Sequence, residues 1–131
     1  MTHVRSTTLR TIIALDAAAC GFAGAGLALD AELLAGPLGL SAQVLQPIGV
    51  FLVAYAAALI WLATRPALPR PVVWTLVAFN LAWAVESLAL PALGWAHPTG
   101  LGLALIVAQA AMAVVVADLQ FLALRRARLM A

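Results

Sequence analysis

Long apolar runs alternate with short polar segments along the whole chain. The four runs cover roughly residues 9–29, 44–64, 72–93 and 101–124. A helix needs about 20 mostly apolar residues to cross the hydrocarbon core of a bilayer. The pattern therefore predicts an all-α fold, a transmembrane four-helix bundle in which residues 1–131 form a single domain.

The segments between the runs differ in character. Prolines at 66, 69 and 71 end the second helix and delay the third. Residues 94–100 lead into the fourth run, and Thr99 is its expected N-cap. Residues 30–43 are apolar and longer than a tight turn. We expect either a short interfacial helix broken near Gly36 and Pro37, or an irregular loop packed over the bundle.

Composition supports a membrane protein. Hydrophobic residues make up 66% of the chain and charged residues 9%, with a mean hydropathy of +1.09. Soluble domains are about 45–50% apolar and about 25% charged. Four spans leave only short loops, so the bilayer is the expected environment and no separate soluble domain is expected.

Arginines give the expected orientation. All seven basic residues are arginines, and they lie in the N-terminal segment, the 65–71 turn and the C-terminal segment. The other two loops carry Asp30, Glu32 and His97 instead. Positively charged segments stay cytoplasmic, so both termini should be cytoplasmic (N-in/C-in). Arginine without lysine, in an alanine- and leucine-rich chain, is typical of a bacterial protein, and the inner membrane is its expected location. The scattered arginines form no basic patch for nucleic acid.

Polar residues inside the spans fall into two layers. An inner layer, about 9–12 Å from the cytoplasmic side by helical rise, contains Asp16, Asn80 and Asp118, with Gln120 slightly nearer the interface. An outer layer contains Glu86 and Gln109. Polar groups at this depth are costly and usually face protein or water.

Helical facing divides these residues further. At about 100° per residue, Gln109 and Gln120 lie on one side of the fourth helix and Asp118 on the other. A single central cavity cannot hold all three. Asp118 is expected either to be satisfied near the headgroups by Arg125 or Arg126, or to face another subunit.

The candidate ligand-binding residues centre on Glu86, an acid with no basic residue in its half of the span. We expect Glu86 to be protonated and hydrogen-bonded to Gln109, or to exchange a proton or cation. Asn80, Trp83 and Asp16 complete the candidate site. The structural alternatives are helix–helix hydrogen bonds for the amides, core packing for Trp83 and interfacial ion pairing for Asp16.

Small residues form a stripe along the first helix, next to the Asp16 face. The stripe consists of Ala17, Gly21, Gly24 and Ala28. Such stripes let another helix approach closely. The sequence therefore predicts helix packing or a subunit contact here, with Asp118 as a second contact position.

Metal, cofactor and catalytic signatures are not found in the sequence. Cys20 is the one cysteine, and the two histidines, His3 and His97, fall outside the predicted spans. No phosphate loop, nucleophile elbow or metal-ligand cluster is present. We expect no cofactor, no metal and no catalytic residues, and a non-enzymatic function.

Several short segments resemble small bacterial four-helix membrane proteins of the DoxX-like type. The segments are residues 15–17, 49–52, 80–83 and 98–102, with Gln109 and residues 119–121. The resemblance implies a four-helix membrane fold over nearly the whole chain. DoxX-like relatives are linked to quinone and sulfur redox chemistry, to which a single cysteine adds little support here.

Two functions remain open. The chain either binds or transports a small ligand, proton or cation through its intramembrane polar residues, or serves as an accessory or structural subunit of a larger membrane complex. A homo-oligomer is compatible with both.

Overall fold

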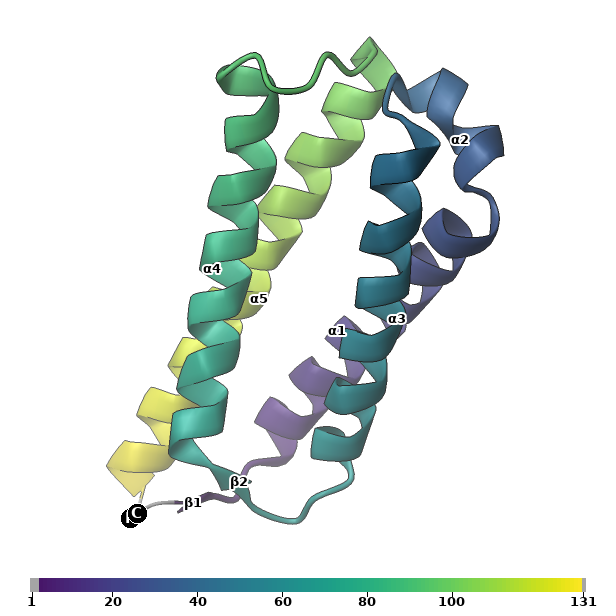
Figure 1. The fold of residues 1–131 in the computed structure, drawn as a ribbon. Helices are drawn as coiled ribbons and strands as arrows, with labels where there is room; N and C mark the ends of the chain where they lie inside the picture. Colours follow the sequence, from purple (N-terminus) through teal and green to yellow (C-terminus); the bar gives the residue numbers. More distant parts are fainter. Residues whose placement is uncertain (1–2, 131) are drawn as a thin grey trace.

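The fold is described by a computed structural model that covers residues 3–130, with side chains to residue 127. Two short strands and five helices follow one another along this part of the chain (Figure 1). They are β1 (His3–Val4), α1 (Thr7–Leu29), α2 (Ala31–Leu38), α3 (Ala42–Ala63), β2 (Leu68–Pro69), α4 (Arg70–Ala92) and α5 (Gly100–Met130).

Four of the helices are long and apolar enough to cross a membrane. They are Thr7–Leu29, Ala42–Ala63, Arg70–Ala92 and the Gly100–Ala127 part of α5. The prediction of an all-α fold with four helices long and apolar enough to span a membrane is confirmed. Each predicted end lies within two residues of the observed one, except that α5 continues past residue 124 to residue 130.

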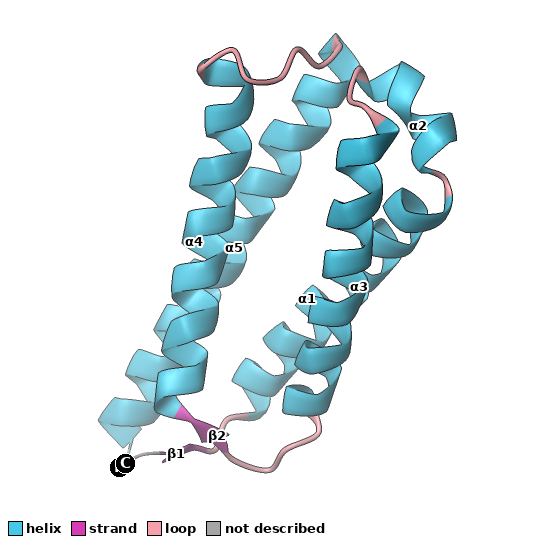
Figure 2. Ribbon diagram, viewed as in Figure 1, coloured by secondary structure: helices cyan, strands magenta, loops and turns pink. Residues whose placement is uncertain are grey.

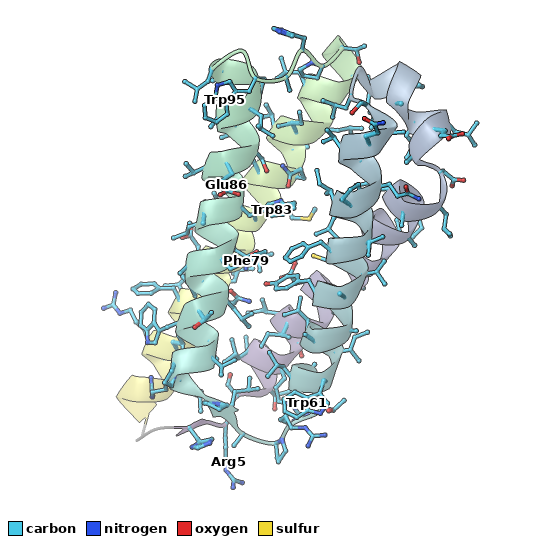
Figure 3. The ribbon with its side chains drawn as sticks, in the orientation of Figure 1. Arg5, Trp61, Phe79, Trp83, Glu86 and Trp95 are labelled. Carbon is cyan, nitrogen blue, oxygen red and sulfur yellow. The ribbon has the colours of Figure 1, made fainter. Side chains whose placement is uncertain are left out.

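The two ends of the bundle are distinct. We call the end that carries β1, β2 and the last turns of α5 the strand end, and the opposite end the α2 end (Figure 1). Figure 3 shows Arg5 and Trp61 at the strand end and Trp95 at the α2 end. Trp61 is 57% and Trp95 71% exposed, as expected of aromatic residues at the two interfaces of a bilayer.

The strands were not predicted. β1 pairs with β2 in antiparallel register, Val4 opposite Leu68 (Figure 2, magenta). Both of these side chains are buried. The prolines of the 65–71 turn keep it extended, which leaves backbone groups free to pair with the N-terminal segment. The pairing ties this segment to the α3–α4 turn.

α2 combines the two expectations for residues 30–43, because it is helical and also packs over the bundle. The expected break near Gly36 and Pro37 is wrong. The helix runs on to Leu38 and ends at Gly39, whose φ of 69° suits a residue without Cβ. Thr99 holds this end: its Oγ1 donates to the Pro37 carbonyl at 2.6 Å and its N–H to the Leu38 carbonyl at 3.1 Å.

Thr99 also caps α5, which confirms the predicted N-cap. Its Oγ1 accepts from the Gly102 N–H at 3.1 Å, while its carbonyl accepts from the Leu103 N–H at 2.8 Å. One residue therefore starts α5 and joins it to the end of α2.

The spans form two helix pairs. α1 packs closely on α3, and α4 packs closely on α5 (Figure 1), whereas the α3 and α4 backbones make almost no close approach. At the strand end an apolar core crosses all four spans. We call this the strand-end core, and its largest members on the spans are Leu9, Ile13, Leu59, Val73, Leu76 and Leu124.

Candidate functional site

Three polar side chains are buried among residues 3–127. Asp16 is 9%, Asn80 5% and Gln120 0% exposed. Each lies three or four residues, about one helical turn, from a member of the strand-end core on its own helix, and each is farther from the strands than that core residue. α1, α4 and α5 therefore place polar groups at a similar height inside the bundle. Together with Tyr55 of α3 we call these residues the polar layer.

Contacts link the members of the polar layer. Asn80 Nδ2 donates to Gln120 Oε1 at 3.3 Å, which joins α4 to α5. In the other helix pair, Tyr55 of α3 packs against the strand-end core and forms no hydrogen bond with Asp16 of α1. The Tyr55 ring in turn lies 4.6 Å from the ring of Phe79, the neighbour of Asn80 on α4. The layer thus extends across both helix pairs.

Three atoms of the polar layer have no hydrogen-bond partner. Asp16 Oδ2, Tyr55 OH and Gln120 Nε2 are all buried, and none is paired within residues 3–127. A buried polar group without a partner costs about 1–3 kcal/mol. Most buried polar groups in proteins find protein, water or ligand partners. Three such atoms on three helices make the polar layer the candidate site.

The Asp16 side chain makes one hydrogen bond within residues 3–127. Cys20 Sγ donates to its Oδ1 at 3.5 Å, one helical turn along α1. This is a long, weak interaction, because a thiol is a poor donor. Within residues 3–127, the interfacial ion pair considered for Asp16 is not formed, since Arg10 on the same helix donates instead to the Ala63 carbonyl at the end of α3.

An aromatic cluster lies beside the polar layer, between α3 and α4. Phe51 and Tyr55 of α3 face Phe79 and Trp83 of α4. The ring centroids are 4.6–6.1 Å apart, the usual spacing of packed aromatic rings. Figure 3 labels Phe79 and Trp83 on α4. We call these four residues the aromatic wall, which bridges α3 and α4.

Gln109 belongs with the aromatic wall. Its Oε1 accepts from the Trp83 indole N–H at 2.8 Å, and its Nε2 donates to the Ile106 carbonyl at 3.0 Å. Two of the predicted site residues are therefore brought together. Because both polar ends of the Gln109 amide are engaged, its role is to fix the orientation of Trp83.

Glu86 does not join these residues. It is exposed on α4 (Figure 3), and it forms no hydrogen bond or ion pair within residues 3–127. The predicted bond to Gln109 is wrong. Six residues of helix turn Glu86 about 120° away from the Asn80 face, and the Gln109 amide is already paired with Trp83.

Asp118 also faces outward, as predicted from its position opposite Gln109. No ion pair with Arg125 or Arg126 forms in the described part of the chain. These arginines lie about two turns away, roughly 10 Å along α5. Two carboxyl groups at membrane depth are thus presented to the surroundings of the monomer.

The small-residue stripe faces α3 of the same chain. A Cβ on Gly24 would lie 2.8 Å from Leu52 Cβ, and a Cβ on Gly49 would clash with the Ala28 backbone nitrogen. Gly21 faces Ala56 at an ordinary contact distance. Helix packing is therefore the role of the stripe. The alternative of a subunit contact stays a prediction.

A pocket of about 330 Å³ opens at the α2 end. Its lining includes Asp30, Glu32, Gln43 and Gln46. These side chains are exposed, and they lie away from the buried polar groups. Within the described residues, no group of three His, Cys, Asp or Glu side chains is placed to hold a metal ion.

Two members of the polar layer, Tyr55 and Gln120, were not predicted as site residues. Tyr55 is the one tyrosine in the chain. Its hydroxyl lies in an apolar span, and this could have placed it among the candidate site residues. Gln120 shares a helix face with Gln109, which placed it toward the interior. The missing information was the pairing of helices, since only this shows that Tyr55 approaches Asp16.

Comparison with protein-family models, with curated proteins and with solved structures finds no match to this chain. The resemblance to DoxX-like proteins stays a prediction. Function is therefore inferred from the buried polar layer and the aromatic wall beside it.

Proposed function

We propose that this chain is a multi-pass protein of the bacterial inner membrane that binds a small polar ligand at the polar layer. A proton or a cation moving through the same layer belongs to this proposal. The observation that carries it is the set of three buried atoms without partners, Asp16 Oδ2, Tyr55 OH and Gln120 Nε2.

The proposed orientation has both termini in the cytoplasm. The segment around β1, the first residues of α1, the α3–α4 turn and the last turns of α5 lie together at the strand end (Figure 1), and these segments carry the arginines. Asp30 and Glu32 lie at the α2 end. This separation of charge supports a cytoplasmic strand end under the positive-inside rule.

The chemistry of the layer selects a ligand that both donates and accepts hydrogen bonds. An ionised Asp16 accepts, the Gln120 amide nitrogen donates and the Tyr55 hydroxyl does either. The Asn80–Gln120 pair can reverse by rotation of both amides, which would present an acceptor in place of the donor. A purely apolar ligand would leave all three atoms unpaired.

The strand-end core closes one route to the layer. Leu9, Ile13, Leu59, Val73 and Leu124 are all at most 1% exposed, so a polar ligand cannot pass them without movement of the helices. Binding is therefore reached from the α2 end or from the side. Transport would require the strand-end core to open.

The experiment is native mass spectrometry of the protein released from lipid nanodiscs. The parent chain and the Asp118→Asn variant should both carry a bound small molecule. The Asp16→Asn variant should retain roughly a tenth as much, which corresponds to the loss of a charge-assisted hydrogen bond. Each change removes one carboxylate from a span, but only Asp16 is buried. Equal occupancy in all three proteins would contradict the proposal.

The second candidate function, an accessory subunit, is favoured by the outward acids. Glu86 and Asp118 are exposed on α4 and α5, and a carboxyl group that faces lipid is costly. A partner helix that donates hydrogen bonds would cover them. Under this alternative, Glu86→Ala and Asp118→Ala would release a co-purifying partner in a pull-down, while Asp16→Asn would retain it.

A further inference from the structure

The interface between α3 and α4 is open to the surroundings of the bundle. Beyond the strand-end core, aromatic rings bridge it, and these rings are not sealed: Phe51 is 44% exposed, and Tyr55, Phe79 and Trp83 are all partly exposed. By contrast, the closely packed faces of α1 and α3 leave no space even for a Cβ at Gly24 or Gly49.

This interface leads directly to the polar layer. The Tyr55 ring belongs to the aromatic wall, stacked 6.1 Å from Phe51 and packed on Phe79. The hydroxyl of the same residue is one of the three buried atoms without a partner. A molecule that entered between the rings would therefore meet these polar atoms with its inner end.

The surroundings of α3 and α4 are lipid over most of their length. Val50, Val53 and Ile60 of α3 and Leu81 and Val85 of α4 are exposed apolar residues, which suits contact with acyl chains. A ligand that enters from this side must itself be soluble in the bilayer. An apolar chain lying against the rings would remain in an apolar environment throughout.

The head of such a ligand must be uncharged. No arginine or lysine occurs in residues 11–64 or 71–124, so nothing at this depth neutralises a phosphate, and Asp16 would repel one. A hydroxyl group both donates and accepts. It can satisfy Asp16 Oδ2, Tyr55 OH or Gln120 Nε2 whichever way the amide pair is oriented.

We propose that the ligand is a lipid alcohol, a single acyl or alkyl chain with an uncharged hydroxyl head, that enters sideways from the bilayer between α3 and α4. The hydroxyl head binds at the polar layer, and the chain lies along the aromatic wall and extends into the membrane. This inference rests on the proposed function and adds the ligand class and the route.

Trp83 reports on the route, because it lies in the aromatic wall. A protein with Trp61→Phe, Trp74→Phe and Trp95→Phe keeps Trp83 alone. It is placed in phosphatidylcholine vesicles with small amounts of 1-monooleoylglycerol brominated on its acyl chain, since bromine quenches indole fluorescence on contact. In two comparison samples, the same mole fraction of brominated phosphatidylcholine or brominated phosphatidylglycerol replaces the brominated monoacylglycerol.

The brominated monoacylglycerol should quench Trp83 roughly three- to tenfold more than either phospholipid, the selectivity expected from one hydrogen bond. Tyr55→Phe and Gln120→Leu should each remove most of this preference. A matched protein that keeps only Trp74, which packs on Phe121 away from the wall, should be quenched equally by all three lipids.

Equal quenching of Trp83 by the three lipids, or stronger quenching by phosphatidylglycerol, would overturn the ligand class. A preference that survives both Tyr55→Phe and Gln120→Leu would overturn the binding of the head at the polar layer. If the lipid result fails while Asp16→Asn still lowers small-molecule occupancy in native mass spectrometry, the lateral route is wrong and the polar layer remains a binding site.

Discussion

The α1–α3 and α3–α4 interfaces differ in what fills them. Glycines bring α1 and α3 into backbone contact at Gly24 and Gly49. Large rings hold α3 and α4 apart, with Phe51 and Tyr55 facing Phe79 and Trp83. α3 therefore has one closely packed face and one face lined by partly exposed aromatic residues.

The two interfaces of α3 are expected to have different roles, one in stability and the other in ligand binding. Lipid gives no hydrophobic drive for helix association, so membrane helices associate through close packing and hydrogen bonds. The α1–α3 interface has this close packing. The α3–α4 interface gains less from packing but adjoins the buried polar atoms that lack partners. We expect substitutions at the first interface to affect unfolding, and substitutions at the second to affect ligand binding.

The largest expected effect is at Gly24. The Gly24→Val variant should lose about 3 kcal/mol of unfolding free energy, because its side chain would overlap Leu52 and the Gly49 carbonyl. Reversible unfolding in mixed micelles, followed by tryptophan fluorescence, measures the loss. Gly26 lies on the same helix with no atom within 4 Å of an added Cβ, so Gly26→Val is the matched control and should change little. Similar losses in both variants would show that the α1–α3 contact is not close.

A smaller effect is expected at Thr99, which ties the two helix pairs together at the α2 end. Thr99→Val removes both the bond to the Pro37 carbonyl and the α5 cap and should cost about 1–2 kcal/mol. The same unfolding assay measures it. Thr75→Val is the control, since the Thr75 hydroxyl donates only to Pro71 of its own helix. An equal cost for the two variants would mean that the α2–α5 tie adds no stability.

The smallest stability effect is expected at Phe51, in the aromatic wall. Phe51→Leu should lower the unfolding free energy by less than about 1 kcal/mol, because the ring is 44% exposed and the change is between apolar side chains. Ligand retention in native mass spectrometry should nevertheless fall. Phe22→Leu changes a ring that is 86% exposed on α1 and should alter neither quantity. A large stability loss at Phe51 with unchanged retention would reverse the assignment of roles.

Sequence periodicity predicted the spans well, because each needs only its own apolar residues. It also predicted that Asp118 faces away from Gln109, since both lie on one helix and facing within a helix is geometric. It failed for Glu86, whose partner had to come from a neighbouring helix, and for the β1–β2 pairing. The closeness of Tyr55 to Asp16 depends on how α1 and α3 pack, and this is decided by glycine contacts that the spacing of polar residues does not reveal.

The most direct test of the polar layer is the effect of Tyr55→Phe on thermal unfolding, measured before and after lipids and small molecules are stripped from the protein. The substitution keeps the ring and removes only the hydroxyl. In the stripped protein it should stabilise the fold or leave it unchanged, because it removes a buried group without a partner. In the ligand-bound protein it should destabilise, because a hydrogen bond to the ligand is lost. The same change of unfolding temperature in both preparations would contradict the account.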